Sequence, residues 1–139
     1  MTRMVRLVTL SICLGWTVAL ALPALQLGGQ TPLTGWYLLI NGWRATGAGV
    51  WAWFANPLFI CAVVLLLLRR ERTAGVLATV ALLLGFSSLA TGPLAARSGY
   101  SLPALTFGPG FHLWLICLFA LCSWTWVISI LKKKQWKSC

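Results

Sequence analysis

The chain is almost free of acidic residues. Its 139 residues include one carboxylate side chain, that of Glu71, and one histidine, His112. This scarcity argues against catalysis by paired carboxylates, against the intramembrane acids of proton-coupled carriers, and against a metal held by acids. Arginines flank Glu71 on both sides, so we expect it to form surface ion pairs and to begin a helix. We expect no cofactor and no metal.

Charged residues of either sign are also scarce. They make up 9% of the chain, whereas 60% of the residues are hydrophobic. This composition supplies too little polar surface for a water-soluble domain, so a lipid bilayer is the expected solvent. Cysteine is absent from 28–49 and 92–110, which argues against a disulfide in either connection. We interpret Cys13, Cys61 and Cys122 as small apolar residues rather than metal ligands, although they fall at similar depths in the apolar runs.

Four long runs lack Lys, Arg, Asp and Glu. They cover residues 7–27, 50–68, 73–91 and 111–131. A helix of roughly 20 apolar residues crosses the hydrocarbon core of a bilayer and satisfies its backbone hydrogen bonds internally. The sequence therefore predicts an all-α fold, an integral membrane four-helix bundle with four transmembrane spans, formed by a single membrane domain over 1–139.

The cations follow the ends of these runs. Nine of the eleven lie before the first run, between the second and third, or after the fourth: Arg3, Arg6, Arg69, Arg70, Arg72, Lys132, Lys133, Lys134 and Lys137. The positive-inside rule places these clusters and both termini in the cytoplasm, as expected for a multi-pass protein of the bacterial inner membrane.

The net charge of +10 does not by itself predict a nucleic-acid partner. Cations at helix ends favour anionic lipid headgroups, and we expect those headgroups, not nucleic acid, as the partners. Arg44 and Arg97 are the exceptions to the charge pattern, because they fall in the external loops 28–49 and 92–110. With no acid to pair with there, each is expected to meet carbonyls, lipid phosphate or a protein partner.

The first run has a second interpretation. Arg3, Arg6, the apolar stretch after them and the small residues of Ala19-Leu20-Ala21 also fit a secretory signal peptide, whose cleavage would leave three spans. Because the apolar run continues to Leu27, which is long enough to span a membrane, we favour a retained first span.

Small residues recur in the third run at alternating spacings of four and three. They are Ala74, Ala78, Ala81, Gly85, Ser88 and Gly92. Helices in lipid associate where small side chains let their backbones approach, and this alternation is typical of left-handed packing. We interpret these residues as a helix-packing seam within one chain. In the alternative, the seam, or a shorter stripe of Ser11, Gly15 and Ala19 in the first run, receives a partner or a second copy.

The loops outside the membrane are rich in aromatic and apolar residues. Trp36, Leu39, Ile40 and Trp43 share one helical face, which predicts a short interfacial helix in the first external loop. In the second external loop, prolines and glycines exclude a continuous helix. We expect the two loops to form a small external cap.

Other aromatic residues fall where spans meet the outer interface. They are Trp51, Trp53 and Trp114, together with Tyr37 and Tyr100. Amphipathic rings at this depth are typical of an aromatic belt that anchors a protein in the bilayer. We therefore predict an external belt that includes all five.

The pair Asn56-Pro57 is the most specific polar signal within a span. Proline has no amide hydrogen and frees the carbonyl of Trp53, so we predict a kink there, with Asn56 bonding across to another helix. In the alternative, Asn56 forms a polar site for a headgroup or an ion. His112, at the outer end of the fourth run, is expected to bond to backbone or lipid. The candidate polar or partner site comprises Asn56, Arg44, Arg97 and His112.

These features favour a small polytopic protein that is not an enzyme and acts by helix–helix contact, as an accessory, regulatory or immunity-type subunit. Its expected partner is a membrane protein or a second copy of itself. One alternative is an oligomeric channel or small-solute facilitator lined by Asn56, Ser87, Ser88 and Thr91. Another is a lipid-modifying membrane enzyme, although Glu71 and His112 are expected on opposite sides of the membrane.

Overall fold

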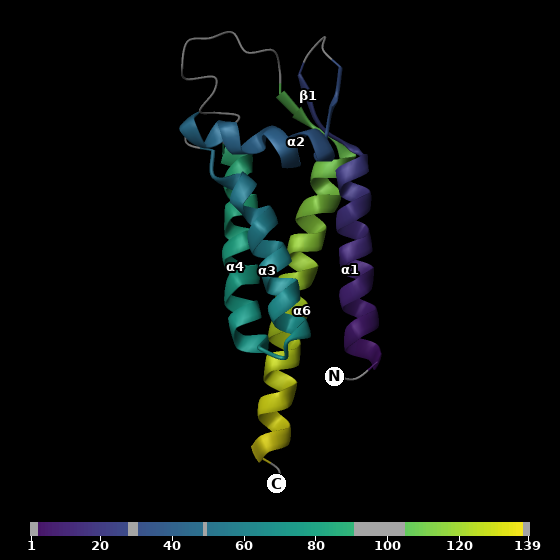
Figure 1. Cartoon of the computed structure of the whole chain (residues 1–139), viewed down its shortest axis with the longest axis vertical. Coiled ribbons are helices and arrows are strands. Elements are labelled where there is room, and N and C mark those ends of the chain that lie inside the picture. Colours follow the sequence, from purple (N-terminus) through teal and green to yellow (C-terminus); the bar gives the residue numbers. More distant parts are fainter. Residues whose placement is uncertain (1–2, 28–30, 49, 91–104, 138–139) are drawn as a thin grey trace.

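The computed structural model describes residues 3–27, 31–48, 50–90 and 105–137 and is mostly helical (Figure 1). Its four long helices are α1 (Arg3–Ala21), α3 (Ala55–Leu67), α4 (Glu71–Ser87) and α6 (Pro109–Lys137). Successive long helices run in opposite directions. The predicted mainly helical class is therefore confirmed.

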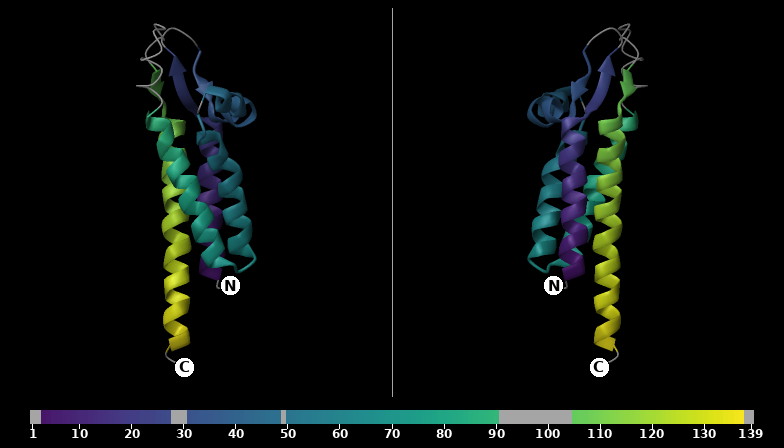
Figure 2. Two further views of the ribbon diagram at one scale, coloured as in Figure 1. Left: turned by 90° about the vertical axis from the view of Figure 1, so that its left-hand side faces the viewer. Right: turned by 90° about the vertical axis from the view of Figure 1, so that its right-hand side faces the viewer.

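The bundle has two unlike ends. The start of α1, the turn between α3 and α4 and the last part of α6 lie at one end, which we call the basic end (Figure 1). The small strands and α2 (Gly35–Asn41) lie at the other, which we call the cap end. The side views in Figure 2 show that α6 extends beyond the α3–α4 turn at the basic end.

The helices do not contact one another equally. Helix α4 lies between α3 and α6, and α6 also packs along α1. The contact from α1 to α3 includes the rings of Trp16 and Phe59, which stack with centroids 5.4 Å apart. Helix α1 is consequently at the edge of the bundle, with α6 as its main helical neighbour.

Two helices in the described part of the chain have the length and apolar character of a membrane span. They are Arg3–Ala21 and Pro109–Lys133, whereas the apolar segment Ala52–Leu67 is shorter. Helical spans over the first and last apolar runs are thus compatible with the structure. The four-span arrangement stays a prediction.

The first helix is placed differently from the predicted span over 7–27. It ends at Ala21, and Pro23–Leu27 form strand β1. Pro23 has no amide hydrogen to continue the helical ladder, so the apolar run changes conformation there. The uninterrupted hydrophobicity of the run hid this boundary.

The predicted kink at Pro57 within a longer span is also wrong. The α-helix α3 begins at Ala55, after the 3₁₀ turn η2 (Ala52–Phe54), so Pro57 lies in its first turn. The amide groups of a first turn have no intrahelical acceptor, and proline is tolerated there without a kink.

The cap contains a small sheet that the sequence analysis did not predict. Strand β1 pairs in antiparallel fashion with β2 (Leu33–Thr34) on one side and with β3 (Leu105–Phe107) on the other. The β1–β3 register places Leu25 opposite Phe107 and Leu27 opposite Leu105. The sheet therefore joins the two loops that we expected to form the cap.

The short helix predicted in the first external loop is present. Thr34 caps α2 by accepting a hydrogen bond from the amide of Tyr37 over 3.3 Å, and the 3₁₀ segment η1 (Gly42–Ala48) follows α2. Figure 1 shows α2 lying across the ends of the long helices. The change from α to 3₁₀ geometry occurs at Gly42.

Two glycines allow the start of α6 to press against the end of α1. A Cβ on Gly108 would overlap the carbonyl oxygen of Pro23, and one on Gly110 would lie 2.8 Å from that of Leu22. Backbone oxygens cannot rotate away from a new methyl group. The amide of Gly108 also donates to the carbonyl of Ala24 over 2.9 Å, which fixes this junction.

The small-residue seam of the third run is used inside the chain. Ala74, Ala78 and Ala81 are almost completely buried, and Gly85 and Ser88 are buried with them. A Cβ on Gly85 would come within 2.6 Å of a methyl group of Leu118 on α6. The last member of the seam, Gly92, lies outside the described residues. The described part of the seam is therefore covered by the bundle itself.

Candidate functional site: a cavity beneath the cap

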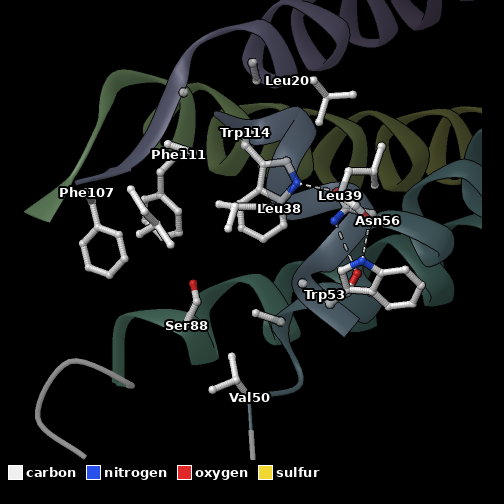
Figure 3. A pocket seen from close by; sticks show the side chains of 17 residues that line it. Leu20, Leu38, Leu39, Val50, Trp53, Asn56, Ser88, Phe107, Phe111 and Trp114 are labelled. Atoms are coloured by element: carbon white, nitrogen blue, oxygen red, sulfur yellow. Dashed lines mark hydrogen bonds between the residues drawn. The ribbon is translucent and has the colours of Figure 1, made fainter. Parts of the chain in front are cut away.

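A cavity of about 180 Å³ lies between the cap and the upper parts of the long helices (Figure 3). Its walls come from the end of α1, from β1, from α2, from the start of α3 and from the start of α6. Most of the lining side chains are apolar, including Leu20, Leu38, Leu39, Val50, Phe107 and Phe111. An apolar cavity of about 150 Å³ stays dry and holds a molecule the size of benzene. This cavity therefore has room for an aromatic side chain or a short piece of hydrocarbon chain.

Asn56 supplies a side-chain amide to this apolar space. It is 8% exposed, its oxygen accepts a hydrogen bond from the indole of Trp114 over 2.9 Å, and its nitrogen donates to the carbonyl of Trp53 over 3.3 Å. Both ends of the amide are thus satisfied by the chain (Figure 3). The predicted bond from Asn56 to another helix is confirmed, and its other partner is the carbonyl that Pro57 leaves without an amide.

A second indole ties the cap to the bundle. The Nε1 of Trp53 donates to the carbonyl of Leu39 on α2 over 2.7 Å. Gly42, at the start of η1, leaves room for this ring, since a Cβ there would lie 2.8 Å from Cδ1 of Trp53. Trp53 and the α2 wall of the cavity are therefore connected by one partly buried hydrogen bond.

Stacked aromatic rings make the wall beside β3. Phe107 and Phe111 stack with ring centroids 4.2 Å apart, and Phe111 meets Trp114 at 5.8 Å. Phe111 is 6% exposed. These rings come from the short stretch in which β3 passes into α6, so the sheet positions one end of the wall and the helix the other.

Of the predicted site residues, the three that the structure describes are not brought together. Asn56 lines the cavity, whereas His112 is exposed and its Nδ1 lies 2.9 Å from the carbonyl oxygen of Gly108. The guanidinium of Arg44 lies 5.7 Å from the ring centre of Trp43, and the Arg44 side chain is exposed. Arg97 lies outside the described residues. The predicted backbone bond of His112 is present.

Sequence reasoning missed most of the cavity. Trp53 and Trp114 were expected in the external aromatic belt, and in the structure the indole N–H of each donates a hydrogen bond within the chain. The belt residues Trp51 and Tyr37 are exposed. The belt residue Tyr100 lies outside the described residues. One feature of the sequence could have indicated these tryptophans. The side-chain oxygen of Asn56, if buried, needs a hydrogen-bond donor, and an indole N–H is such a donor.

The acid and the histidine lie at opposite ends of the bundle. Glu71 begins α4 at the basic end and accepts a hydrogen bond from Lys132 of α6, whereas His112 is at the cap end. Partial burial acts to raise the pKa of the Glu71 carboxyl, but the Lys132 hydrogen bond, its own backbone amide and the nearby charges of Lys132 and Arg69 lower that pKa overall. Glu71 and His112 are therefore not positioned to act on one substrate.

Comparison of the chain with protein-family models, with curated proteins and with solved structures found no match. The chemistry of the site is therefore inferred from its own residues. The walls are apolar, and the Asn56 amide already makes its hydrogen bonds within the chain. The cavity therefore favours an apolar group that fits its shape.

Proposed function

We propose that the chain is a four-span protein of the bacterial inner membrane with its basic end in the cytoplasm. Support comes from the outer faces of the long helices, which carry large exposed apolar side chains, including Leu10, Ile60, Val80 and Phe119. Soluble monomers rarely expose contiguous apolar patches on this scale, and lipid covers such faces without cost.

The two middle helices are short for a bilayer. At 1.5 Å per residue the segment Ala52–Leu67 is about 24 Å long, less than the roughly 30 Å of a typical hydrocarbon core. Local thinning of the bilayer and packing against longer helices accommodate such a mismatch at modest cost. Helix α4 lies between α3 and α6, so a full-length span is its direct neighbour.

Within this membrane we propose a contact function, as an accessory, regulatory or immunity-type subunit that is not an enzyme. The observation that carries the proposal is the position of α1 at the edge of the bundle. Its outward side exposes a column of large apolar residues, Met4, Leu7, Leu10, Leu14 and Val18. Ser11 and Thr17 are exposed there too, and each hydroxyl donates to a carbonyl of its own helix. Small hydroxyl residues among leucines are typical of surfaces where membrane helices meet.

Neither alternative function has comparable support. For a channel, the candidate lining residues diverge: Asn56 and Ser88 border the apolar cavity, whereas Ser87 is exposed and Thr91 lies outside the described residues. For a lipid-modifying enzyme, Glu71 and His112 are at opposite ends of the bundle.

Site-specific photocrosslinking in native membranes tests the contact function. A photoreactive residue at Leu10 on α1 is compared with one at Val80 on α4, since both side chains are apolar and exposed. We expect the α1 position to yield one discrete protein adduct, either a second copy or another membrane protein, and the α4 position to yield lipid adducts. Lipid adducts alone at both positions would contradict the proposal.

A further inference from the structure

The basic end contains a groove of about 710 Å³ between the α3–α4 turn and α6. Arg69, Arg70 and Arg72 come from the turn and the start of α4, and Lys132 and Lys133 come from α6. The hydroxyl residues Thr73 and Ser129 complete the lining with Glu71. Two segments some sixty positions apart in the chain thus bring five cations to one groove.

The charge of this groove is largely uncompensated. Glu71 is the only acidic side chain in the protein, and it pairs with Lys132. That pair holds α4 against α6, and because the groove has five cations and one acid, four positive charges stay uncompensated. A single phosphodiester carries one negative charge, so two phosphates match four uncompensated cations better than one does.

Apolar surface continues from the groove along the same two helices. Val76 on α4 and Ile130 on α6 are each about half exposed and lie within two turns of the groove residues. A soluble phosphate compound has no apolar part that would cover this surface. A phospholipid has both parts, a headgroup for the groove and acyl chains for the apolar side chains beside it. Basic pockets between helices on the cytoplasmic side are known to bind multiply charged lipid headgroups.

We propose that this groove is a binding site for an anionic phospholipid whose headgroup carries two phosphates. The turn arginines and Lys133 contact the phosphates from opposite walls, and the acyl chains lie along α4 and α6. The inference rests on the membrane placement proposed above, because only that placement brings the groove to the level of the headgroups.

The conformation of Arg69 fits this role. Its φ of 63° is left-handed, and the amides of Arg69 and Arg70 donate to the carbonyls of Leu66 and Leu65. This is the helix ending at which glycine is usual, because other residues adopt a left-handed conformation at a cost. The chain nevertheless places a cation there.

Native mass spectrometry of the purified full-length protein tests the site. The protein is titrated with a four-chain, two-phosphate cardiolipin, with phosphatidylglycerol and with phosphatidylcholine. We expect cardiolipin to bind most tightly and the double variant Arg70→Gln/Arg72→Gln to lose about tenfold or more of that affinity. The matched control Arg3→Gln/Arg6→Gln removes the same charge from the same end without touching the groove, and it should lose less than about twofold.

Three results would overturn the proposal: equal losses in the two double variants, equal affinity for cardiolipin and phosphatidylglycerol, or complete displacement of cardiolipin by soluble pyrophosphate. The first two would show diffuse charge attraction, and the third a soluble anion site. Lys133→Gln on the opposite wall provides a second variant if the arginine variant does not fold. A topology assay with reporters at the basic end separates this test from the membrane placement, since lipid binding is measured in detergent.

Discussion

The indole of Trp114 and the amide of Asn56 join α6 to α3 across 58 positions of sequence through a hydrogen bond of 2.9 Å. The same amide donates to the carbonyl of Trp53. One side chain thus satisfies a donor from another helix and an acceptor next to its own proline. The pair closes one side of the cavity and fixes the start of α3 against the start of α6.

We expect Asn56→Ala to destabilise the fold by about 1–3 kcal/mol, because it leaves the Trp114 indole without its acceptor in dry surroundings and removes the side-chain bond to the Trp53 carbonyl. Unfolding in mixed micelles measures this change. Ser87→Ala is the control, since that hydroxyl is exposed and bonds within its own helix. In a cycle with Trp114→Phe, the two losses should be less than additive. Additive losses would show that the two side chains act independently.

Gly108→Ala should loosen the junction between α1 and α6. The new methyl group would meet the Pro23 carbonyl, and we expect a loss of about 1–3 kcal/mol from overpacking. Hydrogen exchange of the β1 amides should accelerate in this variant. Gly75→Ala is the matched control, because the nearest atom to a Cβ at that position belongs to the Trp126 side chain, at 3.3 Å. Equal exchange in both variants would contradict the role of the junction.

The Glu71–Lys132 pair predicts a loss of stability in acid. The pKa of Glu71 is lowered in the folded protein. The ion pair therefore contributes fully to the free energy of unfolding above the pKa of an unfolded glutamate, about 4.3, and this contribution disappears as the pH falls through the lower pKa of the folded state. The Lys132 side chain is 54% exposed, so the contribution should be less than about 1 kcal/mol. Unfolding free energy measured from pH 7 to pH 3 should fall at the acid end in the wild type. In Glu71→Gln this fall should be absent.

Arg69→Gly should stabilise the α3–α4 turn by about 1 kcal/mol, since glycine adopts the left-handed conformation without steric cost. If the groove binds lipid as proposed, the same variant should bind cardiolipin more weakly than the wild type. Thermal unfolding and lipid titration together measure both effects. A variant that is less stable than the wild type would show that the Arg69 side chain itself holds the turn.

The sequence predicted features that follow from local chemistry. The apolar runs predicted long helices, the small residues of α4 predicted a buried packing face, and Asn56 predicted an interhelical hydrogen bond. Each of these depends on a spacing or a residue type that is compatible with few other structures. The helical content could therefore be predicted well, although the hydrophobicity of the first run hid the end of α1 before Pro23, and Pro57 suggested a kink where the structure has the first turn of a helix.

The sequence could not predict features that depend on distant parts of the chain meeting. The pairing of β1 with β3 joins Leu25 to Phe107, and nothing in either short segment indicates the other. The cavity requires the indoles of Trp53 and Trp114 to bond within the chain. In the sequence these two tryptophans cannot be told apart from tryptophans that anchor a protein at the membrane interface. The basic groove forms because the α3–α4 turn faces α6. The number and positions of the cations in the sequence do not predict this packing.

The pairing of β1 with β3 has a consequence for the order of assembly. The ribosome synthesises β1 directly after α1, whereas β3 emerges only after α3 and α4. Until then the central strand of the cap has an open edge, which is the kind of edge that attracts other chains. Closing so long a loop also costs entropy that only the finished contacts repay. Synthesis of β3 is thus the step that completes the cap sheet, and a nascent chain stalled before that step would expose the edge of β1.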